Sequence, residues 1–367
     1  MSQPTLRLTV SLADQLFTQT KSVGIFNLSL GLVEQLARRP EVSRLTVLAN
    51  RTLAGRLPDT LDVRWHDAPA RGRLGRIWWD QWGVYSAAAG IDNEWLLLPK
   101  GFASFTRACP RRLAACVADT IHDFYRAHHP QATSTLERGY FVRSFWGTVR
   151  NAQVIFTISD FTGGEIARLA DARGVQTPPI HTIGIGFSRS GPSVVPKENR
   201  LCVLASPFPH KRTDLAVGWL ARWQRESGFP GQVDWVGRWP AGLLPPDCQN
   251  WHQHERLPEN DYRSLLARAK ALVFFSEYEG FGMPPVEAAL AGACPVFSDI
   301  PATREVMGEC GFAFANTDYE SFRLAMNSSL AVSRDQVEAW AERLLARHNW
   351  NRVLDRLVAG LQAAQSR

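Results

Sequence analysis

The sequence predicts an α/β protein made of two domains, each built around a parallel sheet. Its 367 residues, of which 45% are hydrophobic and 21% charged, are enough for two separate cores. An apolar run over 271–275 is followed by a helical pattern over 286–291 and a second apolar run over 294–298. This order is typical of a parallel strand pair with a right-handed crossover. A proline-dotted stretch at 188–200 predicts a linker between the two domains.

The other elements follow from the same patterns. Apolar runs predict strands, and apolar residues at helical spacing predict a helix over Ile25–Arg39. Ser159 is expected to cap a helix that runs through Leu169. The remaining predicted strands are Leu6–Ser11, Thr46–Ala49, Val63–His66, Trp95–Leu98, Ala115–Ile121, Val154–Ser159, Ile180–Gly186, Leu201–Ala205 and Gly311–Phe314. Asp234–Gly237 is expected to turn from a strand into a loop.

Composition restricts the cellular setting. No apolar run reaches the roughly 18–20 residues that a membrane span needs, and residues 1–14 lack the basic and long apolar regions of a signal peptide. The six cysteines form no C-x-x-C pair, which favours reduced thiols over a disulfide framework or a zinc site. We therefore expect a cytoplasmic protein.

The charge balance favours anionic partners. The net charge is +6 and the pI about 9.2. Nucleotide phosphates, a lipid pyrophosphate or an anionic membrane face would suit this surplus. No nucleic-acid-binding motif accompanies it, so no nucleic-acid partner is expected.

A glycine loop follows the strand at 271–275. Gly280 and Gly282 precede Pro284, whose fixed φ suits the first turn of a helix. Backbone N–H groups at such a helix start favour an anion. Two acids flank the loop, Glu279 before it and Glu287 in the expected first helical turn, so a sugar nucleotide would fit the site. An ordinary strand–helix turn with a nearby glutamate remains the alternative from these residues alone.

The segment Glu279–Glu287, EGFGMPPVE, closely resembles the E-x7-E signature of the family four retaining glycosyltransferases. The flanking sequences FFSEY and GACPV fit that family too, although many members have proline where this chain has Phe275. The resemblance is strong over 200–315 and weak before residue 110. It implies the GT-B fold, in which two Rossmann-like domains face each other across a cleft.

The family pattern also suggests domain boundaries. It implies an N-terminal acceptor domain over 1–187, the linker at 188–200 and a nucleotide-sugar domain over 201–348. A final helix over 349–367 would cross back to the N-terminal domain, and the sequence after Trp350 resembles that helix.

The resemblance assigns residues to the donor. Lys211 matches the lysine that relatives place on the diphosphate, whereas Ala205 stands where many relatives have arginine, and Arg212 is the expected substitute. Glu287 would bind the ribose. The implied donor-binding residues are Ser206, Lys211, Arg212, Gly280, Phe281, Gly282, Met283, Pro284 and Glu287, with Gly24 from the first loop.

Two residues are expected to position the sugar itself, Glu279 and His122. His122 follows an apolar strand, where α/β folds place functional side chains, and it resembles the family histidine that points at the donor sugar. A buried core histidine is the competing interpretation. His128 and His129 lie nearby without a pattern that indicates a metal site.

Residues 71–82, RGRLGRIWWDQW, interleave arginines with tryptophans. Arg76, Trp78 and Trp79 could rest on anionic lipid headgroups beside a lipid-linked acceptor, and Lys21 and Lys100 are further candidates for the acceptor side. The alternative, which we favour, is a helix whose tryptophans pack into the domain core. Peripheral contact with the inner face of the cell membrane is thus a further expectation.

Together these patterns predict a retaining hexosyltransferase, with a mannose-like sugar favoured. It would move the sugar from a nucleotide diphosphate sugar to a saccharide or lipid-linked saccharide. No D-x-D motif occurs, so no metal and no other cofactor are expected. The alternatives are a nucleotide-sugar epimerase or phosphorylase on the same fold, and a nucleotide-sugar-binding protein without turnover.

Overall fold

The computed structural model describes residues 5–16, 23–189, 195–243 and 250–366. The chain forms two compact units. The N-terminal unit contains Met1–Ala127, Thr133–Gly186 and His348–Arg367, and the C-terminal unit contains His128–Ala132 and Phe187–Arg347. Nothing in the sequence indicates that the short segment His128–Ala132 belongs to the C-terminal unit.

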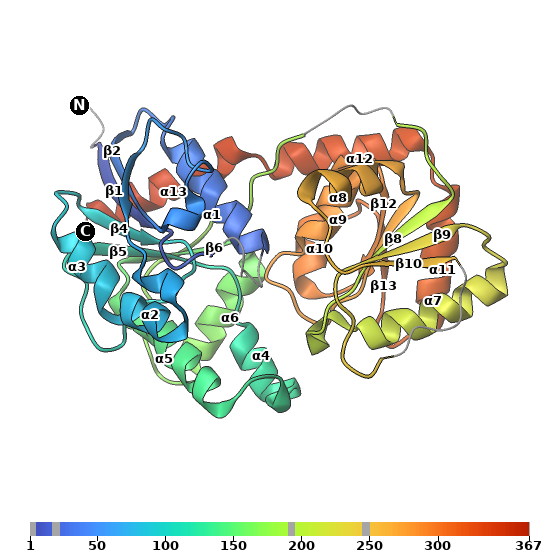
Figure 1. The fold of residues 1–367 in the computed structure, drawn as a ribbon, viewed down its shortest axis with the longest axis horizontal. Coiled ribbons are helices and arrows are strands. Elements are labelled where there is room, and N and C mark those ends of the chain that lie inside the picture. Colours follow the sequence, from blue (N-terminus) through green and yellow to red (C-terminus); the bar gives the residue numbers. More distant parts are fainter. Residues whose placement is uncertain (1–4, 17–22, 190–194, 244–249, 367) are drawn as a thin grey trace. The chain divides into compact units, whose positions relative to one another are not determined.

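The N-terminal unit is built on a seven-stranded sheet in the order β3-β2-β1-β4-β5-β6-β7. Neighbouring strands are parallel, for example β1 with β2 and with β4. All four residues of β4 are buried, as expected for a strand covered on both faces by helices (Figure 1). The strands are β1 Leu6–Ser11, β2 Val42–Ala49, β3 Asp62–Trp65, β4 Trp95–Leu98, β5 Arg112–Val117, β6 Val154–Thr157 and β7 Ile180–Thr182.

The helices of this unit flank the sheet. Ser159 caps α6 as predicted, because its hydroxyl accepts a hydrogen bond from the backbone N–H of Thr162 at 3.1 Å. One turn of π-helix, Trp79–Gly83, joins α2 to α3. The helices are α1 Val23–Leu36, α2 Arg73–Trp78, α3 Val84–Ala89, α4 Ile121–His128, α5 Thr135–Asn151, α6 Asp160–Asp171 and α13 Trp350–Gln365.

The strand predicted directly before His122 was wrong at its end. The sequence predicts a strand over Ala115–Ile121, but β5 ends at Val117. The side chain of Asp119 accepts a hydrogen bond from the N–H of Ile121 at 3.0 Å, and the carbonyl of Thr120 accepts one from the N–H of Asp123 at 2.9 Å. These bonds turn the chain out of the strand and begin α4.

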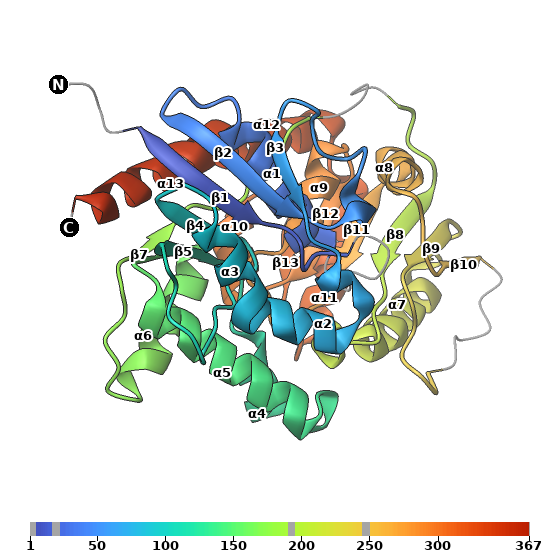
Figure 2. The same cartoon turned by 60° about the vertical axis from the view of Figure 1, so that its left-hand side comes forward.

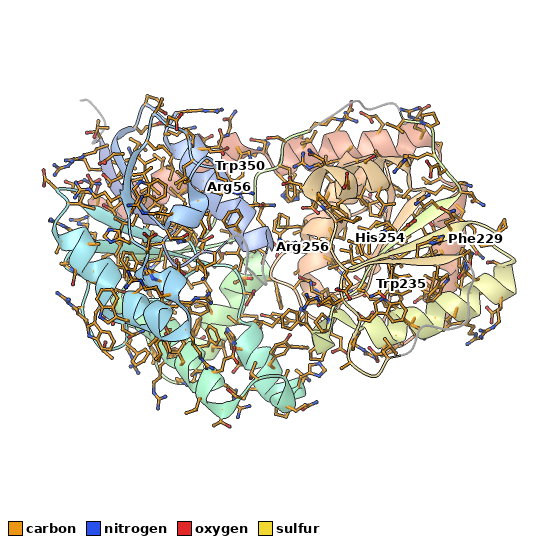
Figure 3. All side chains as sticks on the ribbon, viewed as in Figure 1. Arg56, Phe229, Trp235, His254, Arg256 and Trp350 are labelled. Atoms are coloured by element: carbon orange, nitrogen blue, oxygen red, sulfur yellow. The ribbon has the colours of Figure 1, made fainter. Side chains whose placement is uncertain are left out.

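The C-terminal helix α13 packs on the N-terminal unit, against α1, β6 and β7 (red in Figures 1 and 2). Its first residue, Trp350, is labelled in Figure 3. Two glycines make room for the indole: a Cβ on Gly31 or on Gly186 would lie 2.2 or 2.3 Å from ring atoms. Glycine is therefore required where α13 docks.

The C-terminal unit repeats the same plan on a six-stranded parallel sheet, in the order β10-β9-β8-β11-β12-β13. Strands β11 and β12 are buried along their whole length. Its strands are β8 Arg200–Leu204, β9 Gln232–Val236, β10 Trp251–His254, β11 Ala271–Phe274, β12 Cys294–Ser298 and β13 Phe312–Phe314. Its helices are α7 Thr213–Ser227, α8 Glu259–Arg268, α9 Met283–Leu290, α10 Pro301–Met307, α11 Tyr319–Ala331 and α12 Arg334–Arg347.

Edge strand β10 joins the sheet through a polar link. His254 Nε2 lies 2.8 Å from the carboxylate of buried Asp234 on β9, which also accepts a hydrogen bond from Arg200 at 2.8 Å. His254 and the neighbouring Trp235 are labelled in Figure 3. A buried carboxylate with two partners of this kind is well satisfied and needs no ligand.

None of the helices in the described ranges has the length and the apolar character that crossing a membrane would require.

Candidate active site

Both sheets share the strand order of doubly wound folds, in which the order reverses between the first strand and the fourth. Ligands of such folds bind outside the carboxyl ends of the strands at this switch point. In the C-terminal unit the switch point lies between β8 and β11, and in the N-terminal unit between β1 and β4. The loops that follow these four strands are therefore where a site is expected.

The loop after β8 presents Lys211. The hydroxyl of Thr213 ties the loop to its own start by accepting from the N–H of Ser206 and donating to its carbonyl, both at 2.9 Å. Lys211 Nζ forms an ion pair with Glu279, from the loop after β11, and lies 5.1 Å from the ring centroid of Phe274. The fold thus brings together the lysine and the glutamate that the resemblance assigns to the donor.

The loop after β11 turns through Gly282, whose φ of +88° is in the left-handed region. A Cβ there would lie 2.8 Å from the side chain of Thr303, so glycine is needed for both reasons. Pro284 occupies the first turn of α9 as predicted. Because Pro284 and Pro285 have no N–H, the free donors at this helix start are the N–H groups of Gly282 and Met283.

Glu287 lies in the second turn of α9, which begins at Met283, so the prediction of a first-turn position was wrong. Its side chain is half-buried, and no hydrogen bond to it occurs within the described residues. Burial raises the pKa of its carboxyl to about 7, with Arg263 opposing the shift and Glu259 adding to it. A half-buried carboxylate with spare acceptor capacity can bind hydroxyl groups of a ligand.

A second polar link joins the two loops, and no motif in the sequence indicates it. Glu277 pairs with Arg212, the residue after Lys211, and with His129 from the segment that belongs to this unit. His210, beside them, is buried. Burial, with the charges of Lys211 and His129, lowers its pKa to about 3, so His210 is neutral at physiological pH.

His122 belongs to the N-terminal unit and lies in the first turn of α4, not at a strand end as predicted. Its ring stacks on Phe141, with centroids 4.0 Å apart and an interplanar angle of 10°. Burial lowers its pKa to about 4, so the ring is neutral at pH 7. Its Nδ1 is buried without a hydrogen-bond partner in the described part of the chain.

The switch point of the N-terminal unit holds a cluster of charged side chains. Lys100, two residues after the end of β4, pairs with Asp14 at 2.7 Å. Asp80 lies close by and accepts a hydrogen bond from Tyr140 Oη at 2.7 Å. Burial raises the pKa of Asp80 to about 7, and the charge of Asp14 adds to this shift. Asp14, Asp80 and Lys100 line a cavity of about 20 Å³ together with Ser11, and this volume is enough for one water.

Of these, the sequence indicated only Lys100. Asp14 follows the first predicted strand, which is a usable signal, but nothing in the sequence connects Asp80 with Tyr140.

Of the other candidates, Gly24 is the second residue of α1, and Lys21 lies outside the described residues. Arg76 is half-buried on α2, and its Nε has no hydrogen-bond partner among the described residues.

The tryptophans of the 71–82 segment divide between core and surface. Trp79 is only 2% exposed, lies against the ring of His66 and donates a hydrogen bond to Ser11 Oγ at 3.3 Å. The expectation that Trp79 could touch a membrane was therefore wrong. Trp78 is 49% exposed and Trp82 42%. The segment has an apolar outer face as well as a buried anchor.

Two further features lie away from these loops. A depression of about 600 Å³ opens at the amino ends of β1, β4 and β5, lined among others by Arg7, Asn93 and Arg112. Because the amino ends lie at the opposite edge of the sheet from the switch point, this depression is not part of the candidate site. Within the described ranges, no three His, Cys, Asp or Glu side chains gather as metal ligands.

Known proteins that are similar to this chain include several glycosyltransferases. Residues 248–343 match the family model described as "Glycosyl transferases group 1". The O-antigen chain mannosyltransferase B of Escherichia coli is 24% identical over 360 residues, which cover 88% of this chain and 90% of that protein. The GDP-mannose:cellobiosyl-diphosphopolyprenol alpha-mannosyltransferase of Xanthomonas oryzae is 32% identical over 88 residues, 24% of this chain and 19% of that protein.

Solved structures share the fold. WaaG, a glycosyltransferase involved in lipopolysaccharide biosynthesis, superposes with a TM-score of 0.66 over 97% of this chain and 98% of its own. The two sequences are 15% identical. At this identity the likeness establishes the GT-B fold alone.

Proposed function

We propose that this chain, a group 1 glycosyltransferase of the GT-B fold, transfers a hexosyl group from a nucleotide diphosphate sugar with retention at the anomeric carbon. The acceptor would be a saccharide or a lipid-linked saccharide in polysaccharide synthesis. The observation that carries the proposal is the pairing of Lys211 with Glu279 beside the Gly282 turn, at the switch point of the C-terminal unit. The names of the relatives favour mannose and a GDP donor.

Each group would have a separate task. Lys211 and the N–H groups at the start of α9 would bind the diphosphate and stabilise the charge that develops when it departs. Glu287 would accept hydrogen bonds from the ribose. Glu279 would hold sugar hydroxyls. His122, as a neutral imidazole, is a further candidate for hydrogen bonds to a hydroxyl group.

Thermal-shift measurements with a panel of nucleotide sugars test the donor. GDP-mannose, UDP-hexoses, UDP-N-acetylhexosamines and dTDP-rhamnose form the panel. We expect one of them to raise Tm, because ligand binding to the native state stabilises it. Absence of a shift with every member would contradict the proposal. Release of free sugar or an epimer without acceptor would favour the alternative enzymes, and binding without turnover would favour a non-catalytic protein.

Transfer should not depend on a metal ion. The sequence has no D-x-D motif, so a lysine and helix N–H groups would carry the diphosphate charge instead. Initial rates with and without excess EDTA, on protein dialysed against chelator, measure this directly. Equal rates are expected, whereas loss of activity that Mn²⁺ or Mg²⁺ restores would show that the diphosphate needs a metal.

Peripheral membrane contact remains a proposal, now restricted to specific residues. Leu74, Trp78 and Trp82 are spaced four residues apart, are 82%, 49% and 42% exposed, and lie near exposed Arg71 and Arg73. Such a face could rest on an anionic leaflet, each arginine adding about 1 kcal/mol within a Debye length.

Liposome sedimentation tests this contact. Wild type should sediment with anionic vesicles at low salt and less at high salt, because surface attraction is screened. The Trp78→Ala/Trp82→Ala variant should stay in the supernatant, and Trp79 is kept because it is core. Leu324→Ala, which removes a 54% exposed leucine from the C-terminal unit, is the control. Wild type that stays soluble at low salt contradicts the proposal.

A further inference from the structure

Glu277 joins the two loops of the C-terminal switch point. One carboxylate oxygen accepts a hydrogen bond from Arg212, and the other lies 2.9 Å from His129 Nε2. Its backbone N–H donates to the carbonyl of His210 at 2.7 Å. The three side chains of this link are largely buried, with exposed fractions of 25% for Glu277, 26% for Arg212 and 18% for His129.

Arg212 has a backbone conformation that needs support. Its φ of 44° and ψ of 42° are left-handed, and no other non-glycine residue in the described ranges has a positive φ. This conformation is unfavourable for a residue with a Cβ, which approaches the following carbonyl oxygen too closely. The guanidinium is engaged by Glu277 and by Asp214, whose contact to Arg212 Nε is 3.3 Å. The two ion pairs can offset the backbone cost.

Lys211 directly precedes this fixed residue. The conformation of Arg212 therefore sets the direction in which the Lys211 side chain leaves the loop, toward Glu279. The guanidinium of Arg212 is already shared by two carboxylates, so it has less charge to offer a phosphate than Lys211 has. The sequence predicted that Arg212 would bind the diphosphate in place of the arginine that many relatives have where this chain has Ala205. The arrangement in the structure favours a different role for Arg212.

We propose that Glu277 is a positioning residue for the donor diphosphate. With His129 it fixes Arg212 at the start of α7, so that Arg212 anchors the loop and Lys211 reaches the phosphates. The inference rests on the proposed function, because it specifies how the diphosphate half of that site is held in place.

The sign of one effect separates positioning from simple charge. Glu277 carries a negative charge near a site for an anion, and Coulomb repulsion alone predicts tighter binding when that charge is removed. A positioning role predicts the opposite. Glu277→Gln would release Arg212, the Lys211 side chain would lose its fixed orientation, and the affinity for the diphosphate would fall. The two accounts therefore differ in direction and not only in size.

Isothermal titration supplies the test. The probes are GDP, UDP and dTDP, and the corresponding nucleoside without phosphate. For the diphosphate that wild type binds, Glu277→Gln and Arg212→Ala should each weaken binding about tenfold, the size expected for residues in one network. Nucleoside affinity should not change. Adding Glu277→Gln to Lys211→Ala should cost nothing further, because the lysine it positions is gone.

Glu226→Gln is the matched control. Glu226 lies on the same helix α7, in an exposed pair with Arg222 at 2.7 Å, and its loss should leave diphosphate affinity unchanged. Thermal unfolding verifies that each variant is folded. If Glu277→Gln does not fold, the variant His129→Gln replaces it, because it removes only one of the two partners of Glu277. Weaker diphosphate binding by His129→Gln supports the proposal, and unchanged binding overturns it.

Two other outcomes would overturn the inference. Unchanged or tighter diphosphate binding by Glu277→Gln would show that Glu277 positions nothing. A loss for Arg212→Ala that adds fully to that of Lys211→Ala would place Arg212 on the phosphates. If wild type binds none of the three nucleoside diphosphates, the proposed function itself fails, which is a different and recognisable result.

Discussion

Replacing Glu287 by alanine is expected to weaken binding of the nucleoside diphosphate by about 1–3 kcal/mol, or roughly 5–150-fold. The variant removes a half-buried carboxylate that lies in the second turn of α9 and has spare acceptor capacity. Isothermal titration at pH 8 measures the change. Glu320→Gln, which alters an exposed acid on α11 that pairs with Arg323, serves as the control. An unchanged Kd for Glu287→Ala would remove the ribose-binding role.

The same residue predicts an opposite effect on stability. Burial raises the pKa of Glu287 from its ordinary 4.5 to about 7. Between these values the native state binds more protons than the unfolded state, so this group lowers stability as pH rises from about 4.5 to 7, and the loss is complete above pH 7. Glu287→Gln should therefore raise Tm at pH 8 and leave it nearly unchanged at pH 4. A lower Tm at pH 8 would contradict this account.

The second large effect concerns Lys211. Lys211→Ala should lower kcat/KM by about 10²–10³-fold, the usual cost of removing one preorganised electrostatic contact. It also leaves the carboxylate of Glu279 without its cation, close to where the phosphates would bind. Affinity for the nucleoside without phosphate should stay constant, because Lys211 would contact only the diphosphate.

Steady-state kinetics of transfer, together with titration of the nucleoside, measure both parts of this prediction. Lys211→Arg keeps the charge but not the shape, and an intermediate rate is expected from it. A kcat/KM for Lys211→Ala within about threefold of wild type would mean that the diphosphate lies elsewhere.

The fold was predictable because its central strands are buried on both faces. Such strands appear as short continuous apolar runs, and ALVF at β11 and WLLL at β4 were identified for this reason. Strand β10 was missed, since WHQH at the sheet edge is partly exposed and has no apolar run. His122 was misplaced because the turn at Asp119 ends β5 early, and a side-chain hydrogen bond of that kind leaves only a weak trace in the sequence.

The part of the candidate site that consists of consecutive residues could be predicted from the sequence. The part that depends on contacts between residues far apart in the sequence could not. The two glutamates of the Glu279–Glu287 segment, and the glycines between them, stand in one continuous stretch, so their spacing can be read directly from the sequence. Glu277 and His129 are 148 positions apart, and Asp80 and Tyr140 are 60 apart. Only the folded chain brings such pairs together, so their part in the site had to come from the structure.

The central claim is that the C-terminal unit binds a nucleoside diphosphate between the loops after β8 and β11. A crystal structure of the chain with the nucleoside diphosphate that gives the largest thermal shift tests it most directly. The account predicts the diphosphate on Lys211 and the N–H groups at the start of α9, with the ribose on Glu287. A nucleotide bound at another edge of the sheet, with Glu287 contacting nothing, would contradict it.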